Sequence, residues 1–119
     1  MVGDKKWKWH KVADSKDAID WQTNRMTVVE AGGKKITLAT DNNEVCAFAH
    51  RCPHAGGVLA DGFIDTTGNI ACPLHRFKFS IRNGRNISGE GYFLKLYPVE
   101  QREDGLFVGI GESNWLSMF

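Results

Sequence analysis

The sequence lacks the features that mark secreted, membrane-spanning or nucleic-acid-binding proteins. It has only three cysteines in 119 residues, an odd and low number that does not build a disulfide framework. No apolar run approaches the ~20 residues that span a bilayer, and Met1–Lys11 lacks the apolar stretch of a signal peptide. Basic and acidic side chains number 15 and 14, without the basic excess that nucleic acids or membrane surfaces attract. We therefore expect a soluble cytoplasmic protein that binds neither nucleic acid nor membrane.

Long helical patterns are also missing. Only Asp14–Asp20 predicts a helix, of one or two turns, and the other apolar segments alternate as short strands between turns such as Gly32-Gly33, Asp41-Asn42-Asn43 and Asn83-Gly84. Strand and turn together take roughly ten residues, which is typical of an all-β sandwich or barrel. No repeat or linker interrupts the chain, so residues 1–119 are expected to form one domain. The expected strands are Trp7–Val12, Met26–Glu30, Lys35–Ala39, Glu44–Ala49, Asn69–Ala71, Phe77–Ile81, Tyr92–Tyr97 and Leu106–Ile110.

Two segments depart from this strand pattern, at about residues 50–60 and 71–77. They read Cys-Pro-His-Ala-Gly-Gly from Cys52 and Cys-Pro-Leu-His from Cys72, so that C-x-H is followed after seventeen residues by C-x-x-H. Each segment offers one thiolate and one imidazole from a single loop. The candidate ligands Cys52, His54, Cys72 and His75 suit either tetrahedral Zn²⁺ or an iron–sulfur centre.

The distribution of the ligands separates these two possibilities. Structural zinc sites usually pair two cysteines in one knuckle and two histidines in another, whereas here each loop mixes one of each. The double motif resembles the Rieske family, in which two cysteines bind one iron of a [2Fe–2S] cluster and two histidines bind the other. The resemblance implies that Cys52 and Cys72 bind the buried iron, and that His54 and His75 bind the outer one. It also implies an antiparallel β-sandwich or barrel with a small two-loop cluster-binding subdomain.

The sequence departs from the high-potential members of that family at several positions. Those members carry an extra cysteine in each loop, and the pair forms a disulfide; the matching positions here are Gly57 and Leu74, so this disulfide is impossible. Phe77 and Phe79 stand where those members have hydrogen-bond donors to the cluster sulfurs. A Gly-rich segment, 88–91, replaces their proline-rich loop. Because fewer donors stabilise the reduced cluster less, we expect a potential at the low end of the Rieske range, about −150 mV.

Other chemistry-bearing residues have ordinary interpretations. Cys46 lies in a strand-like run and is expected to be a small buried thiol. His50 is expected to be a loop histidine, with a contact to a cluster ligand as the alternative, and His10 is expected on a strand or at the surface.

Two groups of residues near the ligands have two interpretations each. Arg51 and Arg76 are either solvated or steer an acidic partner. Pro53, Ala55 and Leu74 either form an apolar tip for brief docking or close off the cluster from solvent.

The resemblance predicts an electron carrier and not an enzyme. Such a protein passes one electron between a flavoprotein reductase and an acceptor such as an oxygenase. An oxygenase needs a further iron held by two histidines and a carboxylate, and only His10 and His50 remain, without a motif around them. The alternatives are a small subunit of a larger redox enzyme, such as an assimilatory nitrite reductase, and a zinc-stapled binding module.

Overall fold

Short strands and tight turns form nearly all of the structure. The computed structural model describes residues 7–53, 56–74, 77–87 and 93–111, and within these ranges it has ten strands and two 3₁₀ turns. The strands are β1 (Trp7–Ala13), β2 (Met26–Ala31), β3 (Lys34–Asp41), β4 (Glu44–Ala49), β5 (Phe63–Ile64), β6 (Asn69–Ala71), β7 (Lys78–Ser80), β8 (Leu96–Tyr97), β9 (Val99–Arg102) and β10 (Gly105–Gly111). The 3₁₀ turns are η1 (Lys16–Ala18) and η2 (Leu59–Asp61).

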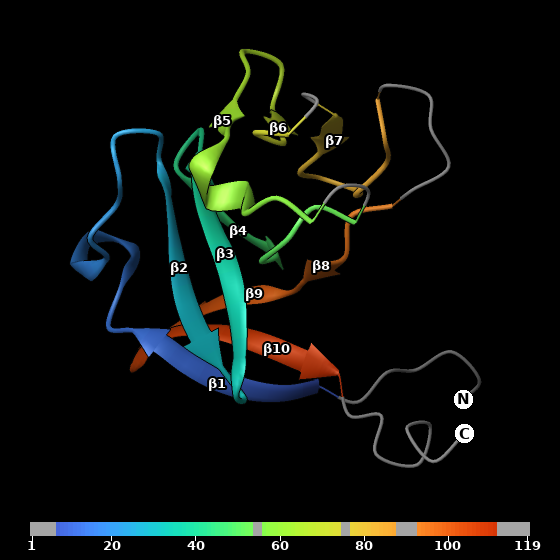
Figure 1. Cartoon of the computed structure of the whole chain (residues 1–119). Coiled ribbons are helices and arrows are strands. Elements are labelled where there is room, and N and C mark those ends of the chain that lie inside the picture. Colours follow the sequence, from blue (N-terminus) through green and yellow to red (C-terminus); the bar gives the residue numbers. More distant parts are fainter. Residues whose placement is uncertain (1–6, 54–55, 75–76, 88–92, 112–119) are drawn as a thin grey trace, which may run out of the picture.

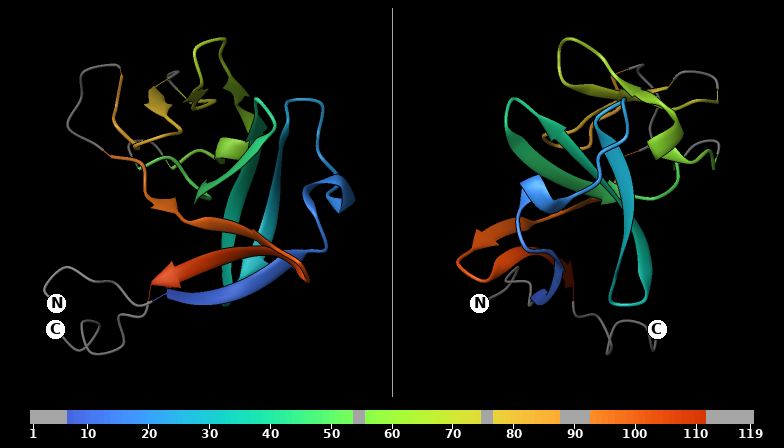
Figure 2. Two further views of the ribbon diagram at one scale, coloured as in Figure 1. Left: turned by 180° about the vertical axis from the view of Figure 1, so that it is seen from behind. Right: turned by 90° about the vertical axis from the view of Figure 1, so that its left-hand side faces the viewer.

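The strands form three antiparallel sheets. The orders are β2-β3-β4-β8, β1-β10-β9 and β5-β6-β7. Figure 1 shows the four-stranded sheet through the middle of the molecule, with β1 and β10 crossing its lower end and β5–β7 gathered above it. The views of Figure 2 show the same separation from behind and from the side. The predicted all-β antiparallel fold is confirmed.

Two tight hairpins set the register of the four-stranded sheet. Gly32 and Gly33 join β2 to β3 with φ values of 59° and 80°, and Asn42 and Asn43 join β3 to β4 with 51° and 66°. Type I′ turns require positive φ at both central residues, which glycine and asparagine tolerate. Both turns were predicted from these residue pairs.

The short elements match the prediction only in part. The predicted helix of one or two turns within Asp14–Asp20 is the single 3₁₀ turn η1, in which the Ala18 and Ile19 N–H groups donate to the Ser15 and Lys16 carbonyls. Within the predicted strand Tyr92–Tyr97 the described residues form a strand only over Leu96–Tyr97. The first residue of that prediction lies outside the described residues.

Three elements were missed, β5, β9 and η2. β5 is two residues long and β9 exposes its last three residues, so neither has an apolar alternation to read. Both are held by pairing with a stronger neighbour, β5 with β6 and β9 with β10.

Two buried clusters of apolar side chains hold the sheets together. One lies between the large sheets, around Leu38, Tyr97 and Val108. The other lies under the small sheet and includes Cys52 and Cys72. Its other buried members are Met26, Ala39, Phe48, Leu59, Ala60, Ile64, Ile70, Phe79, Ile81 and Leu94. The cysteines are therefore part of a packed core.

The described part of the chain contains no helix that is both long and apolar enough to cross a membrane.

Gly62, between η2 and β5, tests how tightly the small sheet packs. A Cβ atom there would overlap the backbone carbonyl oxygen of Ala71, which cannot move aside. We expect Gly62→Ala to lower the free energy of unfolding by about 3 kcal/mol, measured by urea unfolding followed by circular dichroism. Gly33→Ala is the control: no atom lies within 4 Å of its Cβ, so only the positive-φ strain of about 1 kcal/mol applies. Equal losses in the two variants would contradict the close packing.

Candidate metal centre

The Cys52 loop follows β4 and closes on itself through its backbone. The Cys52 N–H donates to the Gly57 carbonyl at 2.8 Å, and the Gly56 N–H donates to the Cys52 carbonyl at 2.9 Å. Arg51 and Val58 pair as a bridge across the base of the loop. Gly56 has a φ of 74°, a conformation that glycine adopts without strain. The exposed guanidinium of Arg51 donates to the Gly56 carbonyl at 2.9 Å, so the loop is held from outside as well.

The far end of this loop is anchored to the large sheet. The Leu59 N–H donates to the His50 carbonyl at 3.0 Å. The Asn24 amide, in the segment before β2, donates to the carbonyls of Ala60 and Gly62 at 2.7 and 3.0 Å. The turn η2 is thereby tied to the residues that precede the four-stranded sheet.

The Cys72 loop joins β6 to β7. The Cys72 N–H donates to the Phe77 carbonyl at 2.8 Å, which continues the β6–β7 pairing into the loop. Asp65 stabilises the same small sheet: it accepts hydrogen bonds from Thr67 and Asn69, and its carboxylate lies 3.1 Å from the Lys78 ammonium. The Asp65 carboxylate thus stabilises the end of the short strands of the small sheet.

The two loops bring two thiols into contact inside the core. Cys52 and Cys72 are 3% and 0% exposed, and neither is in a disulfide. Burial raises the pKa of the Cys72 thiol, and its hydrogen bond with the Cys52 thiol raises this pKa further. The backbone N–H groups of Leu74 and Gly57 donate to the Cys72 sulfur and act in the opposite direction. A thiolate at this position therefore has two hydrogen-bond donors already in place.

Gly57 and Leu74 also pack the two loops against each other. A Cβ atom on Gly57 would lie 3.0 Å from Leu74 Cγ and 3.2 Å from Cys72 Sγ. Leu74 is 46% exposed, so its side chain lies between this contact and solvent. An apolar contact joins the loops where the sequence excludes a disulfide.

The structure describes half of the predicted ligand set. Cys52 and Cys72 are brought together as predicted, whereas His54 and His75 lie outside the described residues, as do Ala55 and Arg76. Of the predicted apolar tip, Pro53 is exposed and Leu74 is half-exposed.

Cys46 and His50 take the ordinary places expected of them. Cys46 is half-buried against the cysteine-containing core, and burial raises the pKa of its thiol. His50 is partly buried, and its carbonyl supports η2. Its Nδ1 is buried and has no hydrogen-bond partner among the described residues. Burial lowers the pKa of His50, and the positive charges of Arg51 and Lys35 lower it further.

His10 lies on β1, as expected. Its ring would be only 2.9 Å from a Cβ atom at Gly32, so it packs against the β2–β3 turn.

The backbone donors are the part of the site that sequence reasoning missed. Every residue except proline has a backbone N–H, so the residue types at positions 57 and 74 do not indicate where their N–H groups point. The Leu74 N–H reaches the Cys72 sulfur from within the same loop, whereas the Gly57 N–H reaches it only because the two loops meet.

The donor set fits a soft metal centre. Two adjacent buried thiols are typical ligands of zinc or of iron–sulfur clusters, and hydrogen bonds to ligand atoms are typical of such sites. No group of three or more His, Cys, Asp or Glu side chains is assembled within the described ranges, since two of the four predicted ligands fall in the gaps.

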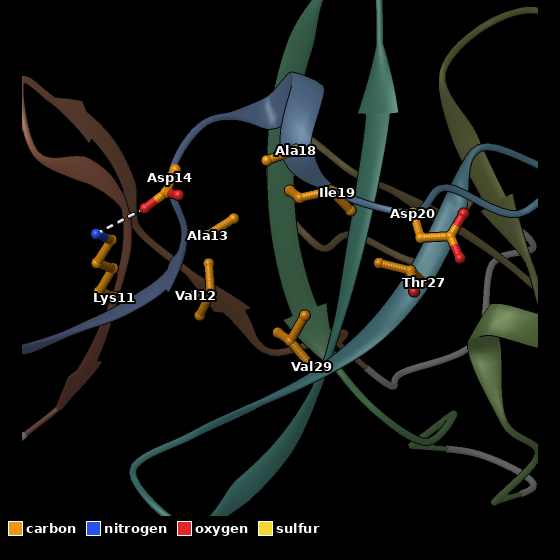
Figure 3. A pocket seen from close by; sticks show the side chains of 9 residues that line it. All are labelled: Lys11, Val12, Ala13, Asp14, Ala18, Ile19, Asp20, Thr27 and Val29. Atoms are coloured by element: carbon orange, nitrogen blue, oxygen red, sulfur yellow. Dashed lines mark ion pairs between the residues drawn. The ribbon is translucent and has the colours of Figure 1, made fainter.

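A hollow on another face has a different character. It lies between the end of β1, η1 and β2, and its lining includes Val12, Ile19 and Val29 (Figure 3). Lys11 and Asp14 form an ion pair of 2.8 Å at its rim. The lining contains neither cysteine nor histidine, so this hollow does not compete with the cysteine loops as a soft-metal site.

The family comparison covers both cysteine loops. Residues 8–92 match the model of the Rieske [2Fe-2S] domain. The chain belongs to this Rieske family. Membership implies a [2Fe–2S] cluster, in agreement with the paired thiols.

Two curated relatives are similar to this chain in sequence over part of its length. The ferredoxin component of the naphthalene 1,2-dioxygenase system of Pseudomonas aeruginosa is 32% identical over 73 residues, which are 60% of this chain and 69% of that protein. Apoptosis-inducing factor 3 of Mus musculus is 38% identical over 65 residues, 55% of this chain but 11% of that protein. This Rieske chain thus spans about a ninth of that second relative.

The solved structure is the ferredoxin of carbazole 1,9a-dioxygenase from Nocardioides aromaticivorans IC177. It superposes with a TM-score of 0.72 at 22% identity and covers 85% of this chain and 96% of the ferredoxin. The likeness shows that this Rieske chain shares the ferredoxin's fold.

A double-mutant cycle tests the contact between the two loops. Gly57→Ala should lower the free energy of unfolding by about 1 to 2 kcal/mol, because its Cβ crowds Leu74 and the Cys72 sulfur. Leu74→Ala removes one of these neighbours, so the double variant should regain about 0.5 to 1 kcal/mol relative to additivity. Urea unfolding of all four proteins measures the coupling, and strictly additive losses would show that the loops are not in contact.

Proposed function

We propose that this chain carries single electrons between a flavoprotein reductase and an acceptor such as an oxygenase. It does so on one [2Fe–2S] cluster held by Cys52, His54, Cys72 and His75. The observation that carries the proposal is the buried contact between the Cys52 and Cys72 thiols, within a chain segment that matches the Rieske model. We propose further that residues 1–119 form one domain that works in the cytoplasm, a reducing compartment that agrees with its three unpaired cysteines.

The residues of the site have distinct tasks. The bound cluster supplies a one-electron redox couple. The buried thiols of Cys52 and Cys72 would bind it, and the N–H groups of Gly57 and Leu74 stabilise negative charge on the Cys72 sulfur. Phe79, fully buried, keeps water away without donating a hydrogen bond. His54 and His75 would complete the ligand set.

The relatives support a carrier. The curated relative is the ferredoxin component of the naphthalene 1,2-dioxygenase system, and the solved structure is the ferredoxin of carbazole 1,9a-dioxygenase. A small domain that docks through a limited area suits the transient contacts of electron transfer.

Absorption and EPR spectra of the purified protein, before and after reduction with dithionite, test the proposal. We expect a brown protein whose reduced form has the EPR signal of mixed histidine and cysteine ligation and not that of an all-cysteine cluster. A colourless protein that contains zinc would establish the binding-module alternative. A brown protein with the spectrum of all-cysteine ligation would overturn the ligand assignment.

His75→Ala tests the histidine half of the ligand set. Because an alanine offers no donor to the outer iron, we expect the visible absorption and the EPR signal of the native cluster to disappear. His10→Ala is the matched control, since His10 lies on β1, and its spectra should equal those of the wild type. An unchanged spectrum in the His75 variant would remove this residue from the ligand set.

A further inference from the structure

The small sheet continues beyond β7 into a strip of paired backbone. The Ser80 N–H donates to the Arg85 carbonyl at 2.9 Å, and the Ile87 N–H donates to the Lys78 carbonyl at 2.8 Å. Arg85 in turn forms an antiparallel bridge with Phe93. Partners across an antiparallel pair point to the same side. Lys78, Ser80, Arg85, Ile87 and Phe93 therefore share one face, which we name the outer strip.

The opposite face of the same backbone is in the core. Phe79, Ile81 and Leu94 alternate with the outer strip and are at most 5% exposed. The period-two alternation of a sheet thus assigns one face to packing and the other to solvent. The outer strip is solvent-facing by geometry.

Two large apolar side chains occupy this solvent face. Ile87 is 54% exposed and Phe93 is 67% exposed, and Arg85, also exposed, lies opposite Phe93. Aromatic residues and arginine are enriched at protein interfaces. An isolated exposed apolar residue needs no explanation, but two on the same strip beside an arginine form a surface suited to a partner.

The charge of this part of the chain indicates which partner. Residues 73–96 contain five basic side chains and one acidic one, in a chain whose totals are 15 and 14. Of these five, Lys78 is partly neutralised by Asp65. Arg82 lines a hollow together with Asp41 and Asp65. Arg85 and Lys95 are exposed. Complementary charge favours an acidic surface.

The outer strip is continuous with the proposed cluster site. β7 begins at the residue after Phe77, whose carbonyl accepts the Cys72 N–H. A protein seated on the outer strip would therefore lie beside the Cys72 loop. Figures 1 and 2 place β7 away from β1 and β10, at the end of the molecule that carries the small sheet.

We propose that the outer strip is the docking surface for an acidic protein partner with an apolar centre. The inference rests on the proposed function, because the partner would be the electron donor or acceptor. Phe93 and Ile87 supply the apolar contact, and the surrounding cations orient the approach. The contact is small and salt-sensitive, as suits a partner that must leave after each transfer.

A fluorescein-labelled acidic peptide, Glu-Glu-Leu-Glu-Trp-Leu-Glu-Glu, tests the surface on the intact protein as purified. Fluorescence anisotropy at low ionic strength should show binding that weakens as salt is added. We expect Arg85→Glu to weaken binding about tenfold and Phe93→Ser about fivefold, as contacts near the centre of an interface do. The same peptide with lysine in place of glutamate should not bind.

Matched control variants test whether peptide binding depends on the outer strip or on any exposed cation or apolar side chain. Lys34→Glu makes the same charge change at the β2–β3 turn, and Val28→Ser removes another exposed apolar side chain, one that is 38% exposed. Both should bind the peptide within about twofold of the wild type. If the wild type does not bind, or if the controls lose as much affinity as Arg85→Glu, the proposal is wrong.

The fold and the cluster content of each variant are measured separately from peptide binding. Circular dichroism and the visible spectrum report whether the fold and the cluster are retained. If Phe93→Ser does not fold, Ile87→Ser tests the same face. A wild type that binds the peptide but has no cluster would overturn the electron-carrier proposal and leave the docking surface standing.

Discussion

The buried contact between the Cys52 and Cys72 thiols is the constraint on which the site depends. Neither cysteine lies within a strand, and in each loop the cysteine N–H donates a backbone hydrogen bond of 2.8 Å across the loop, from Cys52 to Gly57 and from Cys72 to Phe77. Burial disfavours a charged thiolate, so metal binding must overcome this cost. The two N–H groups that donate to the Cys72 sulfur reduce the cost of burying a thiolate before any metal binds. The thiols lie in the core, where burial disfavours a thiolate. The hydrogen-bond donors around the Cys72 sulfur nevertheless favour a charged, metal-bound sulfur.

The large sheets make that arrangement possible. β4 leads directly to the Cys52 loop, and η2 is tied back through the Asn24 amide. The β1-β10-β9 sheet packs against the four-stranded sheet through the cluster around Leu38, Tyr97 and Val108. Within it, the Arg102 guanidinium lies 5.1 Å from the Trp9 ring and 4.6 Å from the Phe107 ring. The long strands therefore form a scaffold, and the cysteines lie on two loops, one that leaves β4 of the large sheet and one that joins β6 to β7 of the small sheet.

Sequence reasoning succeeded where residue type determines local geometry. The pairs Gly32-Gly33 and Asn42-Asn43 tolerate positive φ, so the hairpins that they form were predictable. The unusual mixture of cysteine and histidine likewise identified the loops. The contact of Gly57 with Leu74 was not predictable, because it depends on the meeting of two loops far apart in the chain. β9 was missed since its pairing with β10, and not its own pattern, makes it a strand.

The same limit explains why the outer strip emerges only from the structure. In the sequence, Phe93 and Leu94 are adjacent apolar residues, and alternation alone does not say which faces the core. The pairing of Arg85 with Phe93 decides it, since Leu94 then points inward and Phe93 outward. Outside residues 73–96 the chain has ten basic and thirteen acidic side chains, so an overall charge near zero conceals a basic segment and an acidic remainder. Exposed cations of this segment would attract an acidic partner before contact. Because the Cys72 loop leads directly into this segment, electrostatic orientation and electron transfer would use the same face.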